Sequence, residues 1–136
     1  IMVTQDGRIK VMDFGLAKIA ELDQKLTKTG DIWGTPQFMS PEHFDPNFGE
    51  VDAQSDLFAL SGILYQLLTG RPPFQSASMA ALIYEILSKQ PAPVQDLRAE
   101  IPLSLSQICQ RGLAKNKSER YTCAAEMLED LHKISP

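Results

Sequence analysis

The pattern of apolar and polar positions divides the chain into a short β-like start, a long irregular stretch and a helical remainder. Residues 1–3 and 9–12 are two short β-like runs. Between them lies Asp6-Gly7, a pair typical of hairpin turns because both residues tolerate positive φ. Residues 16–50 show weak periodicity and hold many breakers, namely Gly30, Gly34, Pro36, Pro41, Pro46 and Gly49. We therefore predict a hairpin followed by a long loop, and long loops in compact domains are usually functional or disordered.

A strong helical pattern begins after this loop. Asp52 is a plausible N-cap, and residues 55–69 read as a helix that Gly70 and the following prolines terminate. This segment has almost no polar face, with apolar residues at Leu57, Phe58, Leu60, Ile63, Leu64, Leu67 and Leu68. A helix that is apolar all round is normally buried, so we predict a central buried helix.

Three further helices are predicted downstream. They cover about residues 79–88, a stretch from Pro102 to about residue 113, and a last helix with Thr122 as N-cap. The apolar face of the last helix is expected to comprise Met127, Leu128, Leu131 and Ile134. Pro91 and Pro93 indicate a loop between helices. The fold class predicted is mainly α with a small N-terminal β-hairpin.

Composition and net charge indicate which classes of binding partner are unfavourable. The 136 residues suffice for one domain, and a net charge of −4 with interspersed signs does not favour nucleic acid or an anionic membrane. The longest apolar stretch, residues 57–68, is shorter than the about 18 residues that suggest a membrane span. Cys109 and Cys123 have no metal or redox spacing, so we expect buried thiols in a reducing, cytoplasmic compartment. His43 and His132 are expected at the surface.

A series of short motifs carries the chemical information. Asp13-Phe14-Gly15 follows the second β-like run, and alone it reads equally well as a strand end with a turn glycine. Downstream, in order, come Gly34-Thr35-Pro36, Ser40-Pro41-Glu42, Asp56 and Arg120. The order and spacing of this series resemble the signature set of protein kinases. The resemblance covers essentially the whole chain, and residues 67–74 are similar to the corresponding helix end of serine/threonine kinases, including bacterial ones.

The resemblance implies an incomplete, protein kinase-like C-terminal lobe. Residues 1–136 would form part of a kinase domain, with the hairpin and Asp-Phe-Gly motif in 1–15, the activation segment in 13–42 and a helical bundle in 52–136. The implied activity is ATP-dependent transfer of the γ-phosphoryl group to serine or threonine hydroxyls of a protein substrate. Departing from the family pattern, Leu60 is followed by Ser61 and only then by Gly62, which could alter close helix packing.

Site residues follow from the same resemblance. Asp13 would be the Mg²⁺ ligand beside ATP, with Phe14 and Gly15 completing the motif, because Mg²⁺ prefers carboxylate and phosphate oxygens. Thr35 would support catalysis from the substrate-docking loop. Thr27 and Thr29 are candidate phosphorylation sites of the activation segment, although ordinary solvated threonines would look the same.

Three charged residues are implied to be structural. Glu42 would form a buried ion pair with Arg120, whose fork can hold a carboxylate at two points; a solvated glutamate is the alternative. Asp56 would accept backbone hydrogen bonds from the catalytic loop, or else simply favour the helix dipole from the first turn.

Several kinase elements are not found in this sequence. It has no Gly-rich phosphate loop, no strand lysine and no His-Arg-Asp catalytic loop, so the resemblance implies that the N-terminal lobe and the general base lie upstream. We expect the fragment alone to be inactive. The competing hypothesis is a non-catalytic module, a pseudokinase-like or split helical scaffold.

Overall fold

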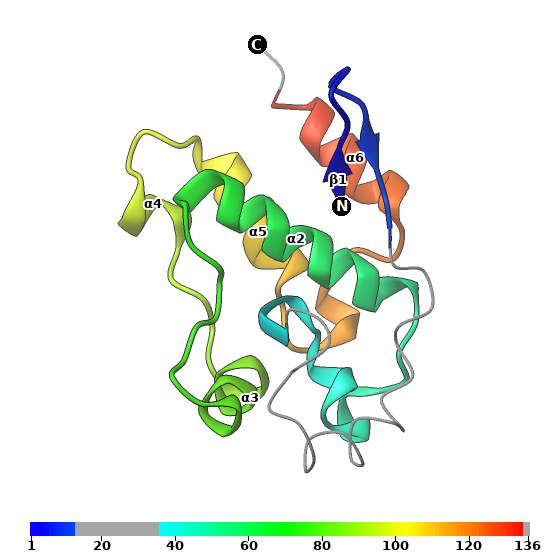
Figure 1. Ribbon diagram of the computed structural model, residues 1–136, viewed down its shortest axis with the longest axis vertical. Coiled ribbons are helices and arrows are strands. Elements are labelled where there is room, and N and C mark those ends of the chain that lie inside the picture. The colour runs from blue at the N-terminus through cyan, green and yellow to red at the C-terminus, as the bar shows by residue number, and fades with distance from the viewer. Residues whose placement is uncertain (13–35, 135–136) are drawn as a thin grey trace. The chain divides into compact units, whose positions relative to one another are not determined.

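The computed structural model of the chain describes residues 1–12 and 36–134 (Figure 1). Its contacts divide it into two compact units, Ile1–Ile32 and Trp33–Pro136, which we describe separately.

The first unit contains the predicted hairpin. Strands β1 (Met2–Val3) and β2 (Ile9–Lys10) pair antiparallel, with Val3 opposite Ile9. Gly7 has φ +79°, a conformation that glycine adopts without steric cost, and it closes the turn. The strands are shorter than the apolar runs that predicted them. Their side chains are exposed, and an isolated two-stranded hairpin is marginally stable at best.

The second unit opens with three single-turn 3₁₀ helices. These are η2 (Pro36–Phe38), η3 (Pro41–His43) and η4 (Pro46–Phe48). Each begins with proline, whose missing N–H is no loss at the first position of a helix. The prediction of an irregular loop over residues 16–50 was therefore too coarse for this part; residues 13–35 lie outside the description.

Helix α2 (Ala53–Thr69) follows the predicted boundaries closely. Asp52 is its N-cap, and its carboxylate accepts a hydrogen bond from the N–H of Gln54 at 2.9 Å. The Ser55 hydroxyl accepts from the N–H of Asp52 at 3.2 Å and completes a capping box. The helix ends at Gly70, in the left-handed conformation with φ +78°.

The burial of α2 corrects one prediction. The helix is covered on one face only: its buried positions are Ser55, Leu57, Phe58, Ser61, Gly62 and Tyr65. On the other side Leu60 is 39% exposed and Leu67 is 78% exposed. An apolar pattern on every side of a helix indicates that burial of each side would be favourable. It does not show that the chain has a segment that packs against each side.

The remaining helices are α3 (Met79–Ser88), α4 (Val94–Leu97), α5 (Leu103–Gly112) and α6 (Ala124–His132), with a 3₁₀ turn η5 (Lys117–Glu119) before the last. Helices α3 and α5 lie where they were predicted. The four-residue α4 was not predicted, because its single turn is too short to show periodicity. None of the helices in residues 36–134 is long and apolar enough to cross a membrane.

Two details of α6 differ from the prediction. Its N-cap is Cys123 and not Thr122. The backbone N–H and the hydroxyl of Thr122 instead donate to the carboxylate of Glu126, at 2.9 and 3.0 Å. Leu128, assigned to the buried face, is 51% exposed, whereas Met127 is buried. A pattern of adjacent apolar residues does not resolve which of the two faces the core.

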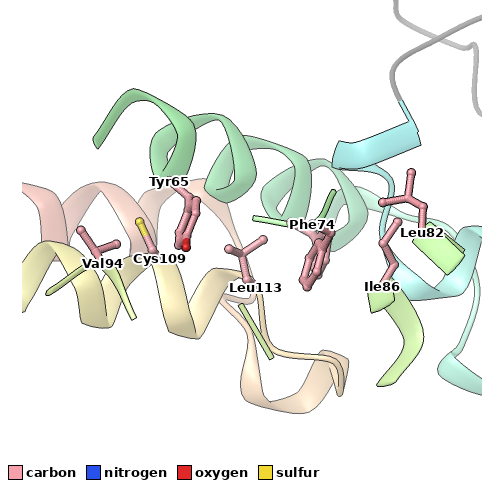
Figure 2. Close-up of a cluster of buried hydrophobic side chains, with 8 residues drawn as sticks. Tyr65, Phe74, Leu82, Ile86, Val94, Cys109 and Leu113 are labelled. Atoms are coloured by element: carbon pink, nitrogen blue, oxygen red, sulfur yellow. The ribbon is translucent and has the colours of Figure 1, made fainter. Parts of the chain in front are cut away.

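The main core lies between α2 and the segment from α3 to α5. Figure 2 shows its labelled side chains in a row along α2, from Val94 at one end to Leu82 and Ile86 at the other. The rings of Phe58 and Phe74 stack with centroids 6.3 Å apart. The cluster consists of Phe58, Tyr65, Phe74, Leu82, Ile86, Val94, Cys109 and Leu113. Burial raises the pKa of the Cys109 thiol to about 12. Cys123 is exposed, so the prediction that both thiols are buried was wrong for it.

Helices α2 and α5 approach closely where the sequence departs from the kinase pattern. The hydroxyl of Ser61 donates to the carbonyl of Leu57 at 2.7 Å. A Cβ added at Gly112 of α5 would lie 1.8 Å from that hydroxyl oxygen, so only glycine fits opposite Ser61. Ser61 is thus accommodated by a glycine on the facing helix.

Candidate functional site

The structure describes three of the predicted site residues, namely Glu42, Asp56 and Arg120. The other six, Asp13, Phe14, Gly15, Thr27, Thr29 and Thr35, lie outside the described residues. Among the residues that are described, no group of three or more His, Cys, Asp or Glu side chains could hold a metal ion. The candidate site is therefore built from the ion-pair region.

Glu42 and Arg120 form a two-point ion pair. Nη1 of Arg120 lies 2.7 Å from Oε1 of Glu42, and Nη2 lies 2.9 Å from Oε2. Both side chains have 0% of their surface exposed. The parallel fork geometry is the strong form of this interaction. It joins η3 to the segment that follows η5.

The rest of the guanidinium is also satisfied. Nε donates to the carbonyl of Ala114 at 2.7 Å, and Nη2 donates to the carbonyl of Lys115 at 3.0 Å. The guanidinium carbon lies 4.9 Å from the centroid of the Phe58 ring in α2. A buried charge is tolerable only when it is paired and hydrogen-bonded, and in Arg120 each of the three guanidinium nitrogens has an acceptor.

Ser55 is a third member of the site, and the sequence analysis missed it. Its hydroxyl donates to Oε1 of Glu42 at 2.6 Å while accepting from the N–H of Asp52. It is 2% exposed. The available signal was its place three residues after the N-cap Asp52, where a capping-box side chain points back over the start of the helix. Ser55 thus joins the cap of α2 to the ion pair.

These contacts decide the charge of Glu42. Burial by itself raises the pKa of this carboxyl, but the hydrogen bonds from Arg120 and Ser55 lower it more. The resulting pKa is about 2, against an ordinary 4.5. Glu42 is therefore ionised across the physiological range, and its negative charge is matched by Arg120.

A second set of hydrogen bonds and an ion pair connect residues 117–121 to the start of α2. The Gln54 amide donates to the carbonyls of Lys117 and Tyr121, at 3.1 and 2.9 Å. The Lys117 ammonium lies 2.6 Å from the Asp52 carboxylate and donates to the carbonyl of Glu50 at 2.6 Å. Together with the ion pair, these bonds fix three chain segments against one another at the N-terminus of α2.

Asp56 lies in the first turn of α2 and is exposed. Its negative charge is favourable there because of the helix dipole. Its expected bonds to a catalytic loop involve residues that this sequence does not contain, so that role stays a prediction. His43 was expected at the surface, but it is only partly exposed and its ring bonds to Ser40.

A contrasting charge network connects α5 and α6. Arg111 pairs with Glu126, and more distantly, at 3.4 Å, with Asp130. Its guanidinium carbon lies 4.1 Å from the centroid of the Tyr121 ring. The Tyr121 hydroxyl donates to Asp130 at 3.1 Å. The charged side chains of this network are about one-third exposed, so water shares their charges.

Comparison with known proteins identifies the family of the chain. The protein kinase domain family matches residues 1–132. The chain is 39% identical over 136 residues to the serine/threonine-protein kinase PknB of Mycolicibacterium smegmatis, covering 98% of the chain. It is 37% identical over 135 residues to PknB of Mycobacterium tuberculosis. It spans about a fifth of the length of these relatives, 21% in each case.

One solved structure shows the same fold. The structure of titin kinase and its flanking domains superposes with a TM-score of 0.62, at 23% identity, over 72% of this chain and 17% of that one. The motif series, the mainly helical fold and the match across nearly all residues agree: the chain belongs to the protein kinase domain family.

Proposed function

We propose that this chain is the C-terminal part of the catalytic domain of a serine/threonine protein kinase, which transfers the γ-phosphoryl group of ATP to protein hydroxyls. The observation that carries the proposal is the buried Glu42–Arg120 pair, together with the family match over residues 1–132. The pair fastens η3 to the helical bundle and so fixes the C-terminal end of the segment that begins at Asp13. Such an anchor is useful to an enzyme that must position a segment against a substrate.

Asp13 is the residue proposed to hold Mg²⁺. A carboxylate is the ligand type that this hard cation prefers, and bound Mg²⁺ would offset the negative charge of the ATP phosphates. Phe14 and Gly15 complete the proposed ATP-side motif. Among the described residues there is no alternative carboxylate cluster for a metal, so the proposal rests on this motif alone.

Thr35 is proposed to support catalysis, and Thr27 and Thr29 are proposed as phosphorylation sites. Each rests on its position between the Asp-Phe-Gly motif and Glu42. Phosphate at either threonine would add nearly two negative charges, which could order a segment by pairing with arginine. Asp56 is proposed to accept backbone hydrogen bonds from a catalytic loop. We propose a cytoplasmic location, with any membrane anchor outside this chain.

The exposed side of α2 supports a requirement for further protein. Asp56, Leu60 and Leu67 all lie on the side of this helix that the described residues leave exposed. Covering a leucine is worth about 1.5–3 kcal/mol relative to leaving it in water. We propose that the rest of the kinase domain covers this side and supplies the general base, so that the chain alone is inactive.

The test is phosphoryl transfer by the whole kinase domain carrying Asp13→Asn. The substitution keeps the size of the side chain but removes the charge that holds Mg²⁺, so we expect transfer from labelled ATP to fall to background while thermal stability is retained. Asp96→Asn, at an exposed position of α4, is the matched control and should leave transfer unchanged. Equal transfer by the Asp13 and Asp96 variants would contradict the catalytic proposal and favour a non-catalytic scaffold.

A further inference from the structure

An imidazole lies beside the buried ion pair and is not explained by the proposed function. His43 is the last residue of η3, and its Nδ1 lies 2.7 Å from the hydroxyl oxygen of Ser40. The backbone N–H of Ser40 points at the same atom, with an N–N distance of 3.2 Å. Ser40 is 0% exposed, so no water competes for these bonds. The contacts between residues 40 and 43 therefore close a turn of the chain that contains Glu42.

The geometry decides the protonation state of this ring. A backbone N–H can only donate, so Nδ1 must be an acceptor and carry no proton. The proton of the neutral ring is then on Nε2, and the Ser40 hydroxyl also donates to Nδ1. A proton added at Nδ1 would face the N–H of Ser40, and that buried donor would lose its partner.

Charged groups from the neighbouring elements act on His43 in opposite directions. Burial has the largest effect and lowers its pKa below the ordinary 6.5. The carboxylates of Glu42 and Asp56 and the backbone hydrogen bond with Ser40 raise the pKa, and Arg120 lowers it. Two other elements also pack against η3. Glu85, the charged residue of α3, pairs with Lys89, and Asp45, the N-cap of η4, accepts from the N–H of Asn47. The net effect is a lowered pKa.

We propose that His43 is a positioning residue: its neutral ring holds the Ser40–His43 turn that presents Glu42 to Arg120, and protonation of the ring loosens that turn. The inference goes beyond kinase activity and does not depend on it. It makes the attachment of this segment sensitive to the protonation of a group other than Glu42 itself.

The direction of the pH effect follows from the lowered pKa. Between the folded pKa and 6.5, the unfolded chain binds more protons at His43 than the folded chain does. The stabilisation from the neutral ring is therefore complete above pH 6.5 and is lost as the pH falls through the window below it.

The first experiment observes the ring directly by NMR of the full chain, with ¹⁵N-labelled histidine. At neutral pH we expect the Nδ1 signal of His43 to show an unprotonated acceptor and the proton to be on Nε2. The titration midpoint of His43 should lie below that measured in the urea-unfolded chain. His132, the other histidine, serves as the internal comparison. An Nδ1-protonated tautomer, or a midpoint equal to the unfolded one, would overturn the proposal.

The second experiment compares urea unfolding of the wild type, His43→Gln and His132→Gln. Glutamine can accept from the N–H of Ser40 as in a capping box, but it does not titrate. Between about pH 7.5 and about pH 5.5 the urea midpoint of the wild type should fall more than that of His43→Gln. His132→Gln should follow the wild type. If the urea midpoints of the wild type and His43→Gln changed equally with pH, the proposal would be overturned. The two proteins share the other titrating groups, so the difference between them reports on His43.

Discussion

Two arginine–carboxylate sites in one chain differ chiefly in their access to water. Arg120 and Glu42 are both 0% exposed, whereas Arg111 and Glu126 retain 38% and 32% of their side-chain surface. In the buried pair each charge depends on the other, because water cannot replace a lost partner. In the exposed network water remains available, and such pairs contribute little to stability. We therefore expect burial, more than the number of ion pairs, to decide which site anchors the fold.

The largest effect is expected when the buried pair is broken. Arg120→Ala leaves the Glu42 carboxylate buried with only Ser55 as a side-chain donor, so unfolding should become easier by about 3–5 kcal/mol. Urea unfolding of the kinase domain, followed by circular dichroism, measures this. Loss of side-chain packing contributes as well, so Arg120→Met, which keeps the stem, separates the two terms. A loss no larger than that of Arg111→Ala would show that the pair is not an anchor.

An intermediate effect is expected at Ser55. Ser55→Ala removes a hydrogen bond to a charged group, a change of about 1.5–3 kcal/mol. It should also raise the pKa of Glu42 from its value of about 2. Because a lowered carboxyl pKa stabilises the fold above 4.5 and loses that contribution as the pH falls toward 2, the acid-unfolding midpoint should move to higher pH.

The matched control for this variant is Ser61→Ala. Ser61 is also a buried serine of α2, but its hydroxyl donates to the backbone carbonyl of Leu57 and not to a carboxylate. The acid midpoint of Ser61→Ala should therefore remain close to that of the wild type. Equal acid shifts in both serine variants would mean that Ser55 does not control the charge of Glu42.

The smallest effect is expected in the exposed network. Arg111→Ala should lower the urea midpoint only slightly, through loss of its exposed ion pairs with Glu126 and Asp130 and of its contact with the Tyr121 ring. High salt should reduce the difference between wild type and Arg111→Ala, because exposed charges are screened. The difference caused by Arg120→Ala should change little with salt. If the effect of Arg120→Ala on stability changed with salt, the Glu42–Arg120 pair would be accessible to water. The two arginine sites would then not differ in their access to water.

Local sequence signals predicted a large part of this fold. The cap at Asp52, the terminating Gly70 and the bounds of α3 depend on neighbouring residues only, and the structure has them where they were expected. The hairpin turn at Gly7 is another local signal. The short helix α4 and the 3₁₀ turns at residues 36–48 were not predicted, because a single turn is too short to show a periodic pattern.

The parts that could not be predicted depend on tertiary contacts. Ser55 looks like an ordinary capping residue until the fold brings Glu42 to its hydroxyl. The exposed leucines of α2 and the exposed Cys123 follow from what packs nearby, which composition does not reveal. His43 gave no signal either, because its effect depends on the turn geometry of Ser40. The kinase resemblance supplied the Glu42–Arg120 pairing that periodicity alone could not.

The sequence separation of the anchor has a consequence for the kinetics of folding. Glu42 and Arg120 are 78 residues apart, so their contact closes a loop that contains most of the helical bundle. Closing so long a loop costs entropy that is recovered only when the intervening helices have already packed. We therefore expect the pair to form after the rate-limiting step, so that changes in it alter the rate of unfolding more than the rate of folding. In that case the pair would chiefly lengthen the lifetime of the folded domain.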